Sequence, residues 1–214
     1  MLRPALAILL VVAPVSSFAQ TTPPPAPATA PTAPTAPTPS NHWVADPAHS
    51  AVGFRVRHLG ITWVNGAFRQ WTAELTYDPN NPEASTVSAR IQAASVDTDN
   101  ERRDNDLRAS YLIVDSFPEI TFTSRRVQQV EPGHLRVTGD LTIRGITHLA
   151  VLDTELGGVL VSPRGRRSAF SATTSVRRQD FGITLNRLME GARIVGDDVR
   201  IIIDIEAIER TTTP

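Results

Sequence analysis

Side chains able to do nucleophilic, acid–base or metal chemistry are few in this sequence. Cysteine and lysine are both absent, and all 21 basic residues are arginine. The missing cysteine excludes thiolate nucleophiles, disulfides, zinc ribbons and iron–sulfur clusters, and the missing lysine excludes Schiff-base catalysis. No two histidines stand at i, i+2 or i, i+4, so we predict no metal site within one strand or helix. The five are His42, His49, His58, His134 and His148.

Among the acidic residues, Asp153 and Glu155 have a spacing that places both carboxylates on one face of a strand. Such a pair suits acid–base catalysis, but a solvated outer face is the more common reason for it. The chain contains no nucleophile elbow, no His-Glu-x-x-His, no phosphate-binding loop and no dinucleotide-binding glycine motif. The residues therefore predict a protein that is not an enzyme.

His58 differs from the other histidines because it ends a stripe of alternating apolar residues. Val52, Phe54, Val56 and His58 have one parity, so a regular strand turns all four side chains to the same side. His58 then lies at the mouth of an apolar interior, where it contacts a ligand head group or, as most buried polar groups do, bonds to nearby backbone. A further hypothesis makes His58 the base of a hydrolase or isomerase, with a carboxylate brought close by folding.

The elements that would position these residues are mostly strands. Alternation of apolar and polar residues with period two marks eight candidates. They are residues 52–56, 71–77, 87–93, 120–122, 135–143, 148–156, 168–176 and 199–205. The predicted fold class is all-β, because apart from one stretch no helical pattern separates the strands, and eight antiparallel strands close into a barrel or fold into a sandwich.

One stretch, residues 99–112, departs from the alternation and predicts a short helix between the third and fourth strands. Asp99 has the side chain of an N-cap, and the i, i+4 spacing of Asp104 and Arg108 suits an ion pair. Arg103, Asp104 and Arg108 would either meet a ligand head group at the barrel mouth or form a salt-bridged surface, which is the more common arrangement.

The beginning of the chain has the pattern of an export signal. Arg3 precedes an apolar run over residues 5–15, and Ser17 and Ala19 are small residues placed for cleavage after Ala19. The apolar run is far shorter than the roughly 20 residues that span a bilayer. Residues 1–19 are therefore predicted to be a cleaved signal peptide, and we expect no transmembrane segment.

Residues 20–40 are rich in proline, alanine and threonine, which predicts a disordered linker. The folded domain is predicted over residues 41–209, followed by a short tail at 210–214. A net charge of −1 lacks the basic surface that phosphate backbones require, so no nucleic-acid partner is expected.

The predicted domain contains an ordered series of short motifs. They are Trp43, Asp46-Pro47, His49-Ser50, His58-Leu59-Gly60, Gly66 and Phe68; Ser95-Val96, Arg103-Asp104 and Leu107-Arg108; Phe117-Pro118 and Ile120-Thr121-Phe122; Leu141-Thr142-Ile143-Arg144-Gly145; and Arg178 with Asp180-Phe181-Gly182. With these motifs, the segment from about Trp43 to Ile208 resembles the YceI-like family. One departure is Tyr111-Leu112, because the family usually has paired aromatics after the helix.

The resemblance implies an extended, lipocalin-like antiparallel barrel that is exported to the periplasm and needs no cofactor. It implies a bound polyisoprenoid, isoprenoid quinone, fatty-acid-like lipid or other long-chain amphiphile, binding rather than catalysis, and a possible homodimer. A role in envelope-stress protection or in isoprenoid or quinone handling would follow from such binding. The alternative is a ligand-free protein-interaction module to which the proline-rich linker gives reach.

Strand parity selects the residues that we expect to line the interior and bind a lipid tail. They are Val52, Phe54, Val56, His58, Leu75, Ile91, Phe122, Leu141, Phe170 and Ile201. An eight-stranded barrel is either filled by its side chains or holds one small ligand, and both cases produce the same alternation. Parity therefore predicts which side chains lie inside but leaves open whether the interior is hollow.

Overall fold

The computed structural model describes residues 40–185, 188–189 and 192–210. The predicted signal peptide, nearly all of the predicted linker and residues 211–214 lie outside these ranges. Within them, no helix combines the length and the apolar character needed to cross a bilayer.

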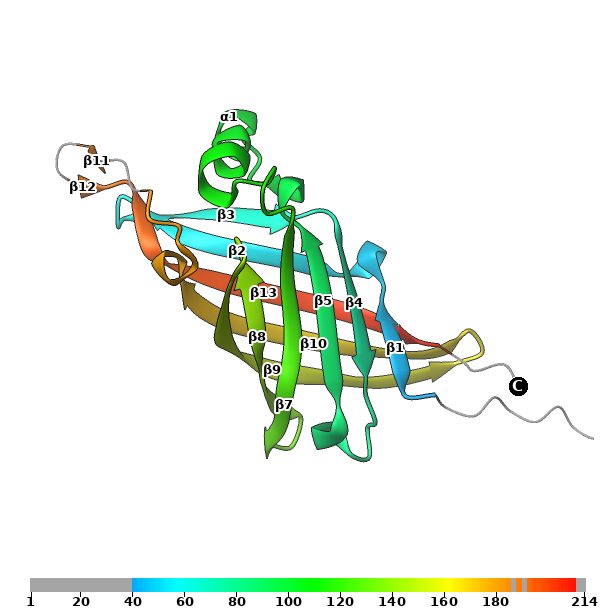
Figure 1. The fold of residues 1–214 in the computed structure, drawn as a ribbon. Helices are drawn as coiled ribbons and strands as arrows, with labels where there is room; N and C mark the ends of the chain where they lie inside the picture. The colour runs from blue at the N-terminus through cyan, green and yellow to red at the C-terminus, as the bar shows by residue number, and fades with distance from the viewer. Residues whose placement is uncertain (1–39, 186–187, 190–191, 211–214) are drawn as a thin grey trace, which may run out of the picture. The chain divides into compact units, whose positions relative to one another are not determined.

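Eight antiparallel strands form a closed ring (Figure 1), which confirms the predicted all-β barrel. In ring order they are β1 (His42–Ala45), β4 (Trp71–Thr76), β5 (Thr86–Gln92), β7 (Glu119–Glu131), β8 (His134–Ile143), β9 (Ile146–Ser162), β10 (Gly165–Arg177) and β13 (Val195–Glu209). The ring closes where β13 pairs with β1, and Trp43 lies opposite Glu209 there. Closure removes the free edges that an open sheet would expose.

The first ring position differs from the sequence prediction. The stretch at 52–56 does form a strand, β2 (Ala51–His58), but the ring is closed by β1, which the alternation did not mark. Both strands pair with β13, β1 near its end and β2 along its beginning. Between them a turn of 3₁₀-helix, η1 (Pro47–His49), interrupts the pairing, because Pro47 has no N–H to donate to a ladder.

After this interruption β2 pairs with β13 on one side and with β3 (Thr62–Phe68) on the other, and β3 in turn pairs with β6 (Val96–Asp97). These three strands extend the sheet beyond β13. The remaining short elements are η2 (Pro82–Ala84), η3 (Ala93–Ser95), η5 (Arg178–Phe181) and the two-stranded pair β11 (Leu188–Met189) and β12 (Ala192–Arg193).

The predicted helix forms as α1 (Glu101–Asp106), continued by a π-helical segment η4 (Leu107–Leu112). Its N-cap is Asn100 rather than Asp99: the Asn100 side chain accepts a hydrogen bond of 3.0 Å from the Arg103 N–H. Asp99 instead has a positive φ of 58°, a conformation that asparagine and aspartate tolerate best after glycine. Figure 1 shows the helix at the end of the barrel where β5 ends and β7 begins.

The charged residues of the helix do not form the salt-bridged surface that their spacing suggested. Asp104 is buried and accepts hydrogen bonds from the Thr98 N–H and hydroxyl, and Arg103 donates to the Thr98 hydroxyl and carbonyl at 2.7 Å each. Arg108 reaches the Val96 carbonyl at 2.7 Å. The expected Asp104–Arg108 pair is replaced by bonds to the neighbouring segment, and these hold the helix against β6.

Candidate functional site

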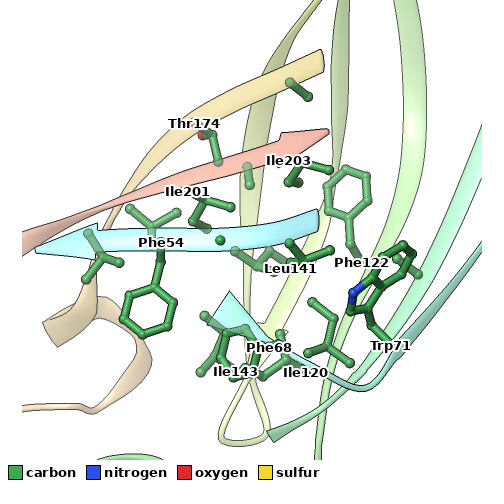
Figure 2. Close-up of a pocket in the computed structure, with 18 of the residues that line it drawn as sticks. Phe54, Phe68, Trp71, Ile120, Phe122, Leu141, Ile143, Thr174, Ile201 and Ile203 are labelled. Carbon is green, nitrogen blue, oxygen red and sulfur yellow. The ribbon is translucent and has the colours of Figure 1, made fainter. Parts of the chain in front are cut away.

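The barrel encloses a cavity of about 910 Å³. This lies within the range of roughly 300 to 1,000 Å³ that is typical of sites enclosing a small-molecule ligand. Figure 2 shows Phe54, Phe122, Leu141 and Ile201 among the side chains around it. The interior of the barrel is therefore hollow, which the alternation of the sequence had left open.

All ten residues selected by strand parity line this cavity. They come from β2 (Val52, Phe54, Val56, His58), β4 (Leu75), β5 (Ile91), β7 (Phe122), β8 (Leu141), β10 (Phe170) and β13 (Ile201). The structure thus places the predicted side chains around one space. Their contact with a ligand stays a prediction.

Strand parity did not select the lining residues of β3 and η4, because the alternation of the sequence did not mark these two elements. Val64 and Phe68 of β3 face the cavity, as do Leu107, Tyr111 and Leu112 of η4. A period-two signal was present in β3 but weak, because the residue between these two on the same face is a glycine. The residues of η4 follow helical spacing, and only the place of the helix over the cavity brings them inside.

Two phenyl rings of the lining cover glycines of adjacent strands. The Phe122 ring lies over Gly139 of β8, where an added Cβ would stand 2.5 Å from Phe122 Cζ. Phe54 covers its β3 partner Gly66 in the same way. Only glycine allows these rings to lie so flat against the sheet, and this arrangement keeps the centre of the barrel empty.

A buried aromatic cluster of Trp43, Tyr77 and Phe170, here called the floor, lies at one end of the barrel, and Tyr77 and Phe170 line the cavity there. Trp43 is fully buried, and its indole N–H donates to the Tyr77 carbonyl at 2.8 Å. The Tyr77 ring meets the Phe170 ring edge-on, with centroids 5.1 Å apart. Burial, and then the nearby Asp78 charge, raise the pKa of the Tyr77 phenol, so this floor stays uncharged.

The polar part of the lining lies toward the other end. β4 and β5 are antiparallel, because Trp71 pairs with Ile91 and Thr76 with Thr86. The end of β4 and the end of β5 therefore lie at opposite ends of the barrel. The floor lies where β4 ends, and α1 lies beyond the end of β5. The charged side chains and the histidine of the lining come from β2, α1 and η5. Among the described residues they are Arg57, His58, Arg102, Arg103, Asp106 and Arg178.

Arg178 is a buried structural cation. Its guanidinium donates to Asp197 Oδ1 at 2.9 Å and to the carbonyls of Ile183 and Gly196 at 2.5 and 3.0 Å. These bonds tie η5 to the start of β13. Its charge is therefore balanced by a carboxylate of the neighbouring strand.

His58 and the Asp153–Glu155 pair are the residues that the sequence offered for acid–base chemistry. Among the described residues, no carboxylate forms an ion pair with His58. Asp153 and Glu155 are exposed on the outside of β9, as expected for a solvated face, and Asp153 lies 3.9 Å from Arg136.

One cluster of metal-ligating residue types does form, on the outside, where η1 meets β13. Ligand atoms of Asp46, His49 and Glu206 lie within 4.8 Å of one another. Arg167 pairs with both carboxylates, so a cation of the protein already lies between them. Hydrogen bonds from His49 and from the Ala48 N–H lower the pKa of Asp46. The ion pairs of this cluster connect the residues around η1 to β10 and β13.

Comparison with known proteins agrees with this geometry. The model of the YceI-like domain matches residues 43–207. Protein YceI of Salmonella arizonae is 36% identical over 164 residues, which cover 76% of this chain and 83% of that protein. The crystal structure of a Campylobacter jejuni YceI protein superposes with a TM-score of 0.64 at 32% identity, covering 77% of this chain and 96% of that one.

A third similarity is one of fold alone. A polyisoprenoid-binding domain from Saccharophagus degradans, implicated in plant cell wall breakdown, superposes with a TM-score of 0.59 at 13% identity and covers 78% of this chain and 98% of that one. The domain match and the Salmonella relative each span most of the barrel. This chain belongs to the YceI-like family.

Proposed function

We propose that this protein is a periplasmic binding or carrier protein that holds a polyisoprenoid, or a similar long-chain amphiphilic lipid, inside its barrel. The observation that carries the proposal is the hollow interior: a cavity of about 910 Å³ lined mostly by apolar side chains, with the aromatic cluster of Trp43, Tyr77 and Phe170 at one end. The Saccharophagus degradans domain, named for polyisoprenoid binding, supports it through its similar fold.

The physical basis of binding is the transfer of hydrocarbon out of water. Each CH₂ group buried in the lumen contributes roughly 0.8 kcal/mol, less the cost of ordering the tail. An apolar lumen selects for the length and thickness of the tail and discriminates little along it. A closed floor sets the depth to which the tail enters, so the head group stays near α1.

The location and the physiological task follow from the same proposal. The predicted signal peptide at residues 1–19 would export the protein, and the predicted linker at 20–40 would act as a spacer between the barrel and a surface or partner. A soluble container with an apolar lumen suits the movement or storage of isoprenoids or quinones between membranes. Envelope-stress protection would be one consequence of such handling.

The experiment is mass spectrometry of organic extracts from the natively exported protein. We expect a stoichiometric long-chain amphiphile in the wild type, and its loss in Phe122→Glu, which places a charge in the lumen. Thr123→Glu is the matched control, because Thr123 is exposed on the outside of the same strand. Leu141→Trp fills the lumen without adding charge and serves if Phe122→Glu does not fold.

Empty extracts from folded wild-type protein, together with no uptake of added lipid, would overturn the proposal and favour the ligand-free interaction module. Equal lipid content in the Phe122→Glu, Leu141→Trp and Thr123→Glu proteins would show that the lipid is bound outside the lumen. Circular dichroism and a cooperative unfolding transition establish that each variant is folded. Sedimentation of the same samples tests the predicted homodimer.

A further inference from the structure

The turn between β2 and β3 exposes aliphatic side chains where hairpin turns ordinarily have polar ones. It consists of Leu59, Gly60 and Ile61, and the Ile61 N–H donates to the His58 carbonyl at 3.1 Å. Glycine, asparagine and aspartate suit the left-handed backbone of such turns, yet Leu59 adopts a positive φ of 51°. Ile61 is 79% exposed, more than any other large hydrophobic side chain of the described residues. The fold thus holds an isoleucine in water at the tip of this hairpin.

A second exposed aliphatic side chain, Leu185, lies close to the same hairpin. The Arg178 guanidinium donates to the carbonyls of Leu185 and Gly196, at 3.0 Å each. Gly196 in turn packs against β2, since a Cβ added to it would stand 3.2 Å from the Cβ of Arg57. Leu185 is 39% exposed. Two separate segments therefore present apolar side chains at this end of the barrel.

The hairpin is also basic. The stretch Ala51–Phe68 contains Arg55 and Arg57 and no acidic residue, although the whole chain has a net charge of −1. Both guanidinium groups stack on the outward-facing Trp63 ring, 4.8 and 4.1 Å from its centroid. Asp198 of the adjoining strand β13 lines the groove beside Trp63, but neither arginine forms an ion pair with it or with another carboxylate of the described residues. The positive charge of the hairpin is therefore not balanced by an ion pair.

The cavity reaches the base of this hairpin. Val56 and His58 of β2 line it, as do Ile194 and Val195 at the start of β13. The Leu59 N–H donates to the Ile194 carbonyl at 2.9 Å, which joins the turn to this part of the cavity wall. The floor lies at the other end of β13. The hairpin thus borders the end of the cavity that is remote from the floor, where a lipid would enter and leave.

A carrier for a long tail has to pass its lipid to a membrane. Each CH₂ group that leaves the lumen for water loses the stabilisation of burial, so release through water is slow for a long tail. Direct contact between the barrel and a bilayer avoids this exposure. Exposed aliphatic side chains insert at a bilayer surface, and neighbouring arginines are attracted to the phosphates of anionic lipids.

We propose that the β2–β3 hairpin docks this protein on the surface of a membrane that contains anionic phospholipid. Ile61 inserts among the acyl chains, and Arg55 and Arg57 lie at the level of the phosphate groups. The Arg57 guanidinium is close to the tip, because its Nη1 donates to the Ile61 carbonyl at 3.5 Å. The cargo that passes between lumen and bilayer rests on the proposed function, whereas the docking itself does not.

The turn between β9 and β10 offers a matched control. Its Leu160 side chain is 64% exposed, comparable with Ile61. Its neighbouring cations are already neutralised, because Arg166 pairs with Glu209 and Arg167 with Glu206. Figure 1 shows the two turns at opposite ends of the barrel, and the β9–β10 turn lies at the end that holds the floor. We expect no membrane contact there.

The first test measures binding to vesicles. Natively exported protein is sedimented with vesicles of phosphatidylcholine, with and without phosphatidylglycerol. We expect the wild type to bind the vesicles that contain phosphatidylglycerol, and added salt to weaken this binding. Ile61→Asp should weaken it about tenfold or more, and Arg57→Gln several-fold. Leu160→Asp should bind as the wild type does.

The second test measures transfer of a fluorescent long-chain lipid from the protein to the same vesicles. The rate of transfer from the wild type and from Leu160→Asp should rise with vesicle concentration, because each transfer needs a collision. Transfer from Ile61→Asp should be slower and nearly independent of vesicle concentration. The affinity of all variants for the fluorescent lipid without vesicles should be equal, because Ile61 does not line the cavity.

Four results would overturn the inference. The wild type does not bind the vesicles; Ile61→Asp binds them as tightly as the wild type; Leu160→Asp loses as much binding as Ile61→Asp; or Ile61→Asp changes the sedimentation of the protein without vesicles, which would show that the tip contacts a second copy of the chain. Failure of the wild type to bind the fluorescent lipid would instead count against the proposed function, and sedimentation with vesicles decides the docking independently of it.

Discussion

Trp43 and His58 are registered with opposite ends of one strand: Trp43 pairs with Glu209, the last residue of β13, and His58 with Val195, its first. At about 3.3 Å per residue, these ends are roughly 45 Å apart along the strand. β13 thus runs from a fully buried indole to a titratable side chain at the polar part of the cavity. Both residues lie along β13 because β1 and β2, on either side of η1, pair with this one strand.

The first prediction concerns the floor. Trp43→Ala should lower the free energy of unfolding by about 3–5 kcal/mol, because the indole is fully buried and its N–H bonds to the Tyr77 carbonyl. Urea denaturation measures the change. Trp63→Ala is the control: its ring is 38% exposed, so a much smaller loss is expected. Equal losses in the two variants would contradict the role of Trp43 as the floor of the barrel.

The second prediction concerns the glycine beneath Phe122. In Gly139→Ala the new Cβ would stand 2.5 Å from Phe122 Cζ and from the Thr123 carbonyl, so the ring has to move toward the lumen. We expect about 1–3 kcal/mol lower stability and reduced lipid capacity. In Gly53→Ala the nearest atoms would be 3.5 Å from the new Cβ, an ordinary contact. Lipid content and unfolding midpoints of both variants test the prediction, and wild-type capacity in Gly139→Ala would refute it.

The third prediction concerns acid sensitivity. The pKa of Asp46 is lowered by the hydrogen bond from His49, then by that from the Ala48 N–H, and Arg167 adds to the effect. A carboxyl whose pKa is lower in the folded state than in the unfolded state stabilises the fold at pH values above its unfolded pKa, which is near 3.8. This stabilisation is lost as the pH falls through the folded pKa. Stability should therefore fall below about pH 4.

Asp46→Asn removes this contribution, so its stability should be lower than that of the wild type at pH 6 and should change less between pH 5 and pH 3. Urea unfolding across this interval measures both slopes. Asp153→Asn is the control, since Asp153 is exposed and its nearest cation, Arg136, is 3.9 Å away. If the stability of Asp46→Asn depends on pH as strongly as that of the wild type, the ion pairs of Asp46 do not contribute to the acid sensitivity.

The sequence was sufficient for the barrel and for its inward face because both depend on period two. Phe122 and Leu141 are registered partners on adjacent strands, and parity alone placed both side chains inside. The ring position of β1 was not predictable in this way. It has only four residues, and its membership depends on where Pro47 interrupts pairing with β13, which is a tertiary relationship.

The charged part of the site was predicted less well. Parity found His58, but the spacing of Asp104 and Arg108 suggested a pair that the fold replaces with bonds to Thr98 and Val96. Local spacing cannot anticipate this, because the competing partners belong to a different element. Arg57 lies at an outward parity position on β2, where its guanidinium stacks on the ring of its β3 partner Trp63, so parity did not select it.

The last prediction concerns how the lipid leaves. Asp104 is buried and accepts hydrogen bonds from the Thr98 N–H and hydroxyl, which fasten α1 beside β6. Asp104→Ala leaves the Thr98 N–H without this acceptor, at a cost of about 1–3 kcal/mol in stability. Since η4 carries Leu107 and Tyr111 into the cavity lining, a loosened helix opens the lumen more often.

Release of a fluorescent long-chain lipid from Asp104→Ala should therefore be faster than from the wild type. Stopped-flow transfer to acceptor vesicles measures the rate. Glu101→Ala is the matched control, because Glu101 lies on the same helix but is exposed. If both variants release lipid at the wild-type rate while Asp104→Ala is measurably less stable, the helix anchors the fold without controlling access. Faster release from Asp104→Ala alone would identify α1 and η4 as the moving wall of the cavity.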